Sequence, residues 1–74
     1  MKKPQKAAAL IDYISMQVAA GLYPVGSRLP SVRRLAMKFA LSYGTTRRGI
    51  GFLVEKGVLL STDGKFCVAP IEAD

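Results

Sequence analysis

Two adjacent arginines lie in a segment whose apolar residues recur at helical spacing. With about 100° between successive residues, a helix would carry on its outward side Gly44, Arg47, Arg48 and Gly51. A guanidinium can donate two parallel hydrogen bonds to O6 and N7 of guanine, and neighbours without side chains let a helix approach a groove floor. Arginines also occur on ordinary solvated helix faces, and each glycine there costs about 1 kcal/mol of helix propensity relative to alanine. The two glycines indicate either close approach to a partner or a loosely held helix.

Four further cations lie where they could bind a phosphate. Arg33 and Arg34 fall in the first turn of a preceding helix, where backbone amides and guanidinium groups suit an anion although the helix dipole disfavours cations. Lys65 follows Gly64 at an expected hairpin tip, where it can reach a minor groove or a phosphate, or remain solvated. Arg28, in the connector before that helix, is the fourth cation that we expect at a phosphate.

The composition also points to a polyanion and excludes several other classes of partner and activity. The 74 residues carry 11 Lys+Arg and 5 Asp+Glu, which gives a net charge of +6 and a pI near 9.9, while half of them are apolar. One small core is therefore expected, without a second domain. With no His and a single Cys, the chain lacks the ligands of a zinc cage and the base of a Cys-His nucleophile. Because the acidic residues are scattered, we expect no enzyme, no cofactor and no metal.

No segment resembles a signal peptide or a membrane-spanning helix. Asp12, Gln17 and Gly21 break the longest apolar stretches well short of about 18 residues. The basic start, residues 2–6, lacks the dense cationic pattern of helices that lie on membrane surfaces. We therefore expect a cytoplasmic protein without a membrane partner.

Apolar periodicity predicts three helices. The first is expected over residues 4–20 and closed by Gly21, the second begins after the N-cap Ser31, and the third covers about 43–56 after the N-cap Ser42. The inward side of the third helix is predicted to carry Thr46, Gly49, Ile50 and Leu53. Phe52 lies at the margin of that side, either tucked under the hairpin or part of a contact patch.

A hairpin is predicted after the third helix. Two β-prone runs, 58–61 and 66–69, flank Asp63-Gly64, a pair that readily adopts the positive φ angles of a tight turn. A very short strand is also possible at 27–29. Three helices and a hairpin, with about three residues between the second and third helices, give a mainly α fold of the winged helix-turn-helix class. The domain is predicted over 1–70, with a tail or the start of a linker at 71–74.

Other large side chains receive a packing interpretation. Tyr13 and Tyr23 are expected at the edge of the core, and Met16 and Met37 are expected to fill gaps in it. None of them is expected to form a platform for stacked bases.

The segment 23–36, Tyr-Pro-Val-Gly-Ser-Arg-Leu-Pro-Ser-Val-Arg-Arg-Leu-Ala, resembles the N-terminal domain of the GntR family of bacterial regulators. Residues 41–57 look like the family's Val-Ser-Arg-x-Thr-Val-Arg-x-Ala-Leu recognition stretch with its closing glycine. The resemblance covers about residues 10–69. It implies a winged helix-turn-helix repressor or activator that binds double-stranded DNA, usually as a dimer on a palindromic operator. The family's larger metabolite-binding domain is missing, so the chain is either a free-standing small DNA binder or the DNA-binding domain of a longer regulator.

The resemblance implies contacts at particular positions. The family's helix-two arginine is Arg33, its recognition-helix contacts are Thr45 and Arg47, and its wing tip is 64–65. Tyr43 stands where the family commonly has arginine, and the wing, Asp-Gly-Lys-Phe-Cys-Val at 63–68, lacks one family glycine. Together, the residues predicted to bind DNA are Arg28, Arg33, Arg34, Ser42, Tyr43, Gly44, Thr45, Arg47, Arg48 and Lys65.

Two further expectations concern assembly and an alternative function. The isolated chain is expected to be a monomer or a weak homodimer that dimerises on a palindromic site. The alternative is a protein–protein interaction module built on a winged helix, whose surface would combine Phe52 with the apolar first helix.

Overall fold

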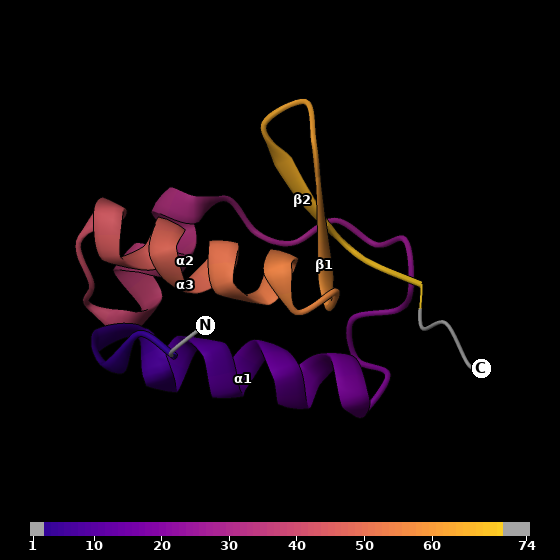
Figure 1. Cartoon of the computed structure of the whole chain (residues 1–74), viewed down its shortest axis with the longest axis horizontal. Coiled ribbons are helices and arrows are strands. Elements are labelled where there is room, and N and C mark those ends of the chain that lie inside the picture. The colour runs from indigo at the N-terminus through magenta and orange to yellow at the C-terminus, as the bar shows by residue number, and fades with distance from the viewer. Residues whose placement is uncertain (1–2, 71–74) are drawn as a thin grey trace.

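A computed structural model describes residues 3–70 of the chain (Figure 1). Its elements, in order, are the 3-10 turn η1 (Gln5–Ala7), α1 (Ala8–Ala19), α2 (Val32–Phe39), α3 (Tyr43–Glu55), β1 (Leu59–Thr62) and β2 (Lys65–Val68). Helix α1 runs below α2 and α3 in Figure 1, and the β1–β2 hairpin stands out on the opposite side. This arrangement confirms the predicted winged helix-turn-helix. The tail expected at 71–74 lies outside the described residues.

Helix α1 is shorter than the helix predicted over 4–20. The chain first forms the 3-10 turn, with Pro4 as its N-cap, and Ala7 then leaves the helical region at φ −101° and ψ 9° before α1 begins. At the other end Gly21 takes φ 77°, the left-handed conformation expected of a residue that closes a helix.

Serine caps fix the starts of α2 and α3, as predicted. Ser31 Oγ accepts a hydrogen bond from the Arg34 amide at 3.2 Å, and Ser42 Oγ accepts one from the Thr45 amide at 3.1 Å. Between the two helices, Ala40 has φ 54°, a conformation that costs energy for a residue with a Cβ. This left-handed residue turns the chain sharply enough for α3 to follow α2 after a very short connection.

The hairpin is closed by the predicted two-residue turn. Asp63 and Gly64 have φ 49° and 76°, and the register pairs Thr62 with Lys65 and Leu59 with Val68. The observed strands are therefore displaced by one residue from the runs predicted at 58–61 and 66–69, since a two-residue turn requires 62 and 65 to be partners.

The short strand expected at 27–29 is reduced to a single β-bridge between Arg28 and Cys67. Backbone bonds on either side of the bridge, from the Leu29 amide to the Phe66 carbonyl and from the Val68 amide to the Ser27 carbonyl, are both 2.9 Å long. They tie the connector to the outer edge of β2 and so hold Arg28 next to the hairpin.

The core lies between the three helices and the base of the hairpin. Its fully buried side chains include Leu10, Ile14, Leu35, Ile50, Leu53, Leu59 and Val68. Phe52 is only 9% exposed and belongs to the same cluster, so it is a core residue and no contact patch. Phe52 is therefore not available for the apolar surface that the alternative, a protein–protein interaction module, requires.

The aromatic residues at the core edge are placed as predicted, whereas the methionines are not. Tyr13 and Tyr23 are partly buried against the core, with ring centroids 6.5 Å apart. Met16 and Met37 are 68% and 78% exposed, which contradicts the expectation that they fill core gaps. The apolar stripes of α1 and α2 face the core through Ile14, Leu35 and their neighbours, and both methionines lie off those stripes.

Gly49 allows the close contact between α3 and the first turn of the chain. A Cβ at this position would lie 2.8 Å from the Ala7 Cβ and 3.3 Å from Leu10 Cδ2. We expect Gly49→Ala to lower the free energy of unfolding, because overpacking costs about 1–3 kcal/mol and outweighs the gain in helix propensity of about 1 kcal/mol. The matched control is Gly51→Ala, since a Cβ at Gly51 meets nothing within 4 Å and only the propensity gain remains. Urea unfolding of both variants checks this, and equal stabilisation by both would contradict it.

Candidate nucleic-acid interface

The outward face of α3 is available to a partner along most of its length. Gly44, Arg47 and Arg48 are exposed and Gly51 is half-buried, while the inward residues Thr46, Gly49, Ile50 and Leu53 are buried, as the helical spacing predicted. Two guanidinium groups thus project from α3, and on the same side the helix backbone is exposed at Gly44. A helix of this kind can approach a groove closely with two donors directed outward.

Hydroxyl groups at the start of α3 form a small hydrogen-bond network. Ser42 Oγ donates to Thr45 Oγ1 at 2.9 Å, and Thr46 Oγ1 donates to the Ser42 carbonyl at 2.8 Å. In this network Thr45 Oγ1 acts as an acceptor, so its own hydrogen remains free for an outside acceptor. A phosphate oxygen, guanine O6 or N7, or thymine O4 could accept it. Thr46, in contrast, is buried and has a structural role.

A groove separates the hairpin from the starts of α2 and α3. It has a volume of about 660 Å³, and its lining includes Arg28, Arg33, Arg34, Tyr43, Gly64 and Lys65. Cations that are far apart in the sequence, and that were each predicted separately to meet a phosphate, therefore come together in one groove. Arg47 and Arg48 do not line the groove and lie on the exposed face of α3. Ser31, which was predicted only as a helix cap, also lines the groove. The sequence signal for this role was its position between Pro30 and the two arginines.

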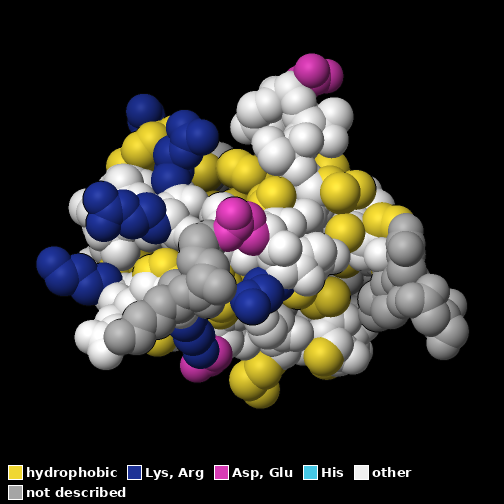
Figure 2. Space-filling view, viewed as in Figure 1, with side chains coloured by type: hydrophobic (Ala, Val, Ile, Leu, Met, Phe, Trp, Pro, Cys, Tyr) yellow, Lys and Arg dark blue, Asp and Glu magenta, His cyan; other side chains and the backbone are white. Residues whose placement is uncertain are grey.

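The charge of this region is positive and is not neutralised by nearby acids. Figure 2 shows Lys and Arg side chains gathered on the side of the molecule occupied by α2 and the start of α3. Within residues 3–70, the one ion pair joins Lys3 to Asp12, away from the groove. The hairpin contributes a single acidic residue, Asp63, at its exposed tip. An anion that enters the groove therefore meets cations from the connector, α2 and the wing.

Other kinds of site receive no support from the part of the chain that the structure describes. Among residues 3–70, no group of three His, Cys, Asp or Glu side chains is arranged to hold a metal ion. None of the helices formed by these residues is long and apolar enough to cross a membrane.

The sequence was compared with those of known protein families. The sequence model of the gntR family of bacterial regulatory proteins matches residues 6–68. The chain belongs to the GntR family. Among curated relatives of this GntR-family chain, the uncharacterized HTH-type transcriptional regulator YdfD of Bacillus subtilis is 32% identical over 65 residues. The putative HTH-type transcriptional regulator RmpR of Mycobacterium gastri is 34% identical over 61 residues.

The chain spans only a small part of these relatives. The matches cover 88% and 82% of this chain but 14% of YdfD and 22% of RmpR. The matches therefore do not show that this chain recognises or regulates what the complete relatives do.

Solved structures show the same fold. The DNA-binding domain of AraR, in complex with operator ORE1, superposes with a TM-score of 0.82 at 32% identity, covering 86% of this chain and 79% of that one. YtrA from Sulfolobus acidocaldarius, a GntR-family transcription factor, gives a TM-score of 0.79 at 26% identity over 89% of this chain and 57% of its own. The helix and wing arrangement described above is thus shared with DNA-binding domains of known structure.

Proposed function

We propose that the chain is a sequence-specific, double-stranded DNA-binding transcriptional regulator that acts in the cytoplasm and has no enzymatic activity. The observation that carries the proposal is the cationic groove between the hairpin and the helix starts, next to the exposed arginine face of α3. AraR, whose DNA-binding domain shares this fold, has been solved with its operator. In our proposal α3 enters the major groove and the hairpin follows the neighbouring backbone.

The proposed contacts divide into two groups. Groove cations are assigned to phosphates, where they position the domain without reading sequence: these are Arg28, Arg33, Arg34 and Lys65. Residues at the N-cap and on the first two turns of α3 are assigned to base edges or adjacent phosphates: these are Ser42, Tyr43, Gly44, Thr45, Arg47 and Arg48. Tyr43 is 53% exposed at the start of α3, so it can offer its ring and hydroxyl where the family commonly offers arginine.

Two copies are proposed to bind a palindromic operator. The isolated chain would be a monomer or weak dimer in dilute solution and would pair on half-sites about one helical turn apart. Pairing on DNA doubles the number of contacts without requiring a stable dimer beforehand. Sedimentation at low micromolar concentration would detect a tight DNA-free dimer, which would contradict this part of the proposal.

Separate substitution of Arg47 and Arg33 tests whether base contacts and phosphate contacts are divided between them as proposed. Arg47→Ala should reduce discrimination between a selected operator and random duplex by roughly 1–3 kcal/mol, because a bidentate base contact is lost. Arg33→Ala should weaken binding to both duplexes about equally, because a phosphate contact carries no sequence information. Fluorescence anisotropy with the two duplexes at one fixed salt concentration measures both effects.

Lys56→Gln is the control for the change in net charge, since Lys56 caps the far end of α3 and does not line the groove. Equal losses from Arg47→Ala on both duplexes would remove its base-reading role. Failure of the unaltered chain to bind any duplex at low salt would contradict the proposed function itself.

A further inference from the structure

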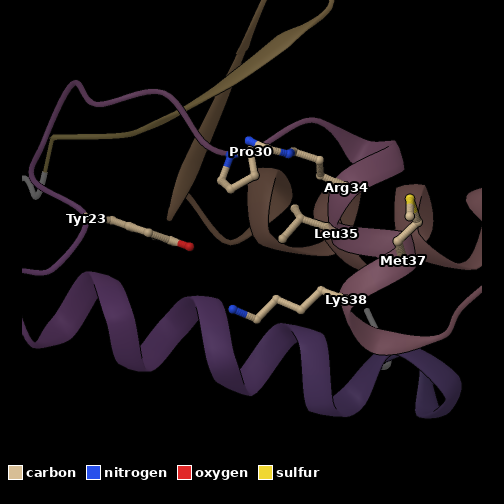
Figure 3. Close-up of a pocket in the computed structure, with 6 residues that line it drawn as sticks. All are labelled: Tyr23, Pro30, Arg34, Leu35, Met37 and Lys38. Carbon is tan, nitrogen blue, oxygen red and sulfur yellow. The ribbon is translucent and has the colours of Figure 1, made fainter.

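A second hollow lies on the flank of α2, outside the groove assigned to DNA. Figure 3 shows it above α1, between α2 and the connector that follows α1. It has a volume of about 480 Å³ and is lined by Tyr23, Pro30, Arg34, Leu35, Met37 and Lys38. This volume falls within the range of about 300–1,000 Å³ that is typical of small-molecule sites.

Two cations one helical turn apart border the hollow without an acidic partner. Arg34 and Lys38 are four residues apart on α2, a spacing at which like charges destabilise a helix by about 0.2–0.5 kcal/mol. No acid lines the hollow, and within residues 3–70 the single ion pair is that of Lys3 with Asp12. The described part of the chain thus concentrates positive charge here and leaves it uncompensated.

Lys38 is held at the hollow by an aromatic residue of α1. Its Nζ donates to Tyr13 Oη at 3.0 Å and lies 4.5 Å from the centroid of the Tyr13 ring. The Tyr13 ring is itself fixed by edge-on packing against Phe39 at 5.3 Å, and the Lys38 hydrogen bond lowers the pKa of the Tyr13 phenol. Because one N–H serves Tyr13, two ammonium donors remain for an outside ligand.

The other lining groups divide into polar and apolar sides. In Figure 3 the Tyr23 hydroxyl and the Lys38 ammonium both point into the space between the connector and α2. The buried Leu35, together with Pro30 and the exposed Met37, supplies apolar surface next to them. A ligand that satisfies both sides needs an anionic group and an apolar body.

We infer that this hollow binds a small anion with an apolar group, a carboxylate or a phosphate monoester, through Arg34 and Lys38. The anionic group lies at the cationic border of the hollow formed by Arg34 and Lys38, and the apolar body lies against Leu35, Pro30 and Met37. Charge-assisted hydrogen bonds of this kind are about twice as strong as neutral ones. The pre-positioned ammonium of Lys38 reduces the entropy lost on binding.

Arg34 connects this hollow with the proposed DNA interface. It lines both the 480 Å³ hollow and the 660 Å³ groove next to the hairpin. A bound anion would engage the Arg34 guanidinium and reduce the positive charge offered to a DNA phosphate. This regulatory part of the inference rests on the proposed function, and it predicts that the small anion and DNA weaken each other's binding.

An NMR titration of the ¹⁵N-labelled 74-residue chain tests the binding site. Benzoate and phenyl phosphate serve as anionic probes, and benzamide is the neutral probe of similar shape. The two anions should give saturable amide shifts at residues 23 and 31–38, and Lys38→Gln and Arg34→Gln should each weaken binding roughly tenfold, as the loss of one charged hydrogen bond implies. Lys56→Gln should leave the affinity unchanged.

Either of two results would overturn the site: equal binding of benzamide, or unchanged anion affinity in both Lys38→Gln and Arg34→Gln. Thermal unfolding of each variant shows that the comparison is made on folded protein. Because Arg34 and Lys38 are both solvent-exposed, neither substitution removes a core residue.

A competition experiment tests the coupling to DNA. Benzoate should raise the Kd for duplex DNA in the unaltered chain more than the same concentration of sodium chloride does, and this excess should disappear in Lys38→Gln. An identical benzoate effect in the two proteins would overturn the coupling. If the chain binds benzoate but no duplex at all, the proposed function fails while the anion site stands.

Discussion

Raising the salt concentration from 50 to 200 mM should weaken DNA binding by roughly 150-fold. This figure follows if the four groove cations each neutralise one phosphate, since log K then falls with log salt at about −0.9 per contact, or about −3.6 in all. The four are brought to one groove by the connector, α2 and the hairpin, and no acid lines that groove. Anisotropy titrations of a labelled duplex at several salt concentrations give the slope.

Single substitutions, studied in the same titrations, distinguish the effect of losing a groove contact from the effect of lowering the net charge. Arg33→Ala should make the slope shallower by about 0.9, because one phosphate contact is lost. Lys56→Gln removes the same unit of charge outside the groove and should leave the slope almost unchanged. A slope near zero in the unaltered chain, or equal changes in the two variants, would show that the groove does not hold the DNA backbone.

The parts of the fold that were predicted from sequence are those set by short-range chemistry. Ser31 and Ser42 cap helices because a side-chain oxygen can reach an amide three residues on, and Asp63-Gly64 closes a hairpin because both residues tolerate positive φ. These causes act within a few residues of the chain. They therefore leave a pattern in the sequence that marks each start and turn.

Two features were missed for different reasons. The sequence placed Gly49 on the inward side of α3, but the need for glycine there comes from the close approach of Ala7, which lies far away in the sequence. The left-handed conformation of Ala40 is local to the end of α2, and alanine does not favour it. Met16 and Met37 carry an apolar side chain, but the faces of α1 and α2 that turn inward are selected by other residues. Helical spacing alone does not show which of several apolar residues the packing will bury.

The candidate site shows the same division between local and distant causes. The outward direction of Arg47 and Arg48 follows from the periodicity of α3 and the burial of its opposite side. The meeting of Arg28 with Lys65 in one groove depends instead on the bridge between the connector and β2, which joins residues 28 and 67. Both cations were candidates by residue type, but only the fold shows that they share a groove.

Phe52→Ser should lower the melting temperature of the domain by about 12–24 °C. Truncating a buried phenylalanine costs about 3–5 kcal/mol, and about 3 kcal/mol corresponds to such a shift in a domain of 60–100 residues. Phe52 packs in the core cluster with Ile50 and Leu53 beside it on α3, so serine would leave a cavity and bring a hydroxyl into it. Because a domain of this size has a stability of only several kcal/mol, much of the protein would be unfolded near physiological temperature.

Tyr43→Ser is the matched control, since it makes a similar aromatic-to-serine change on the same helix at a residue that is 53% exposed. It should shift the melting temperature by only a few degrees, because surface substitutions usually change stability by about 0.5 kcal/mol or less. Its expected effect is on sequence preference, as Tyr43 lies at the groove beside Arg33 and Lys65. Circular dichroism melting combined with duplex binding distinguishes the two roles. A Phe52→Ser protein that melts like the unaltered chain but loses cooperative binding to a palindrome would place Phe52 at a contact between two copies and contradict its position in the core.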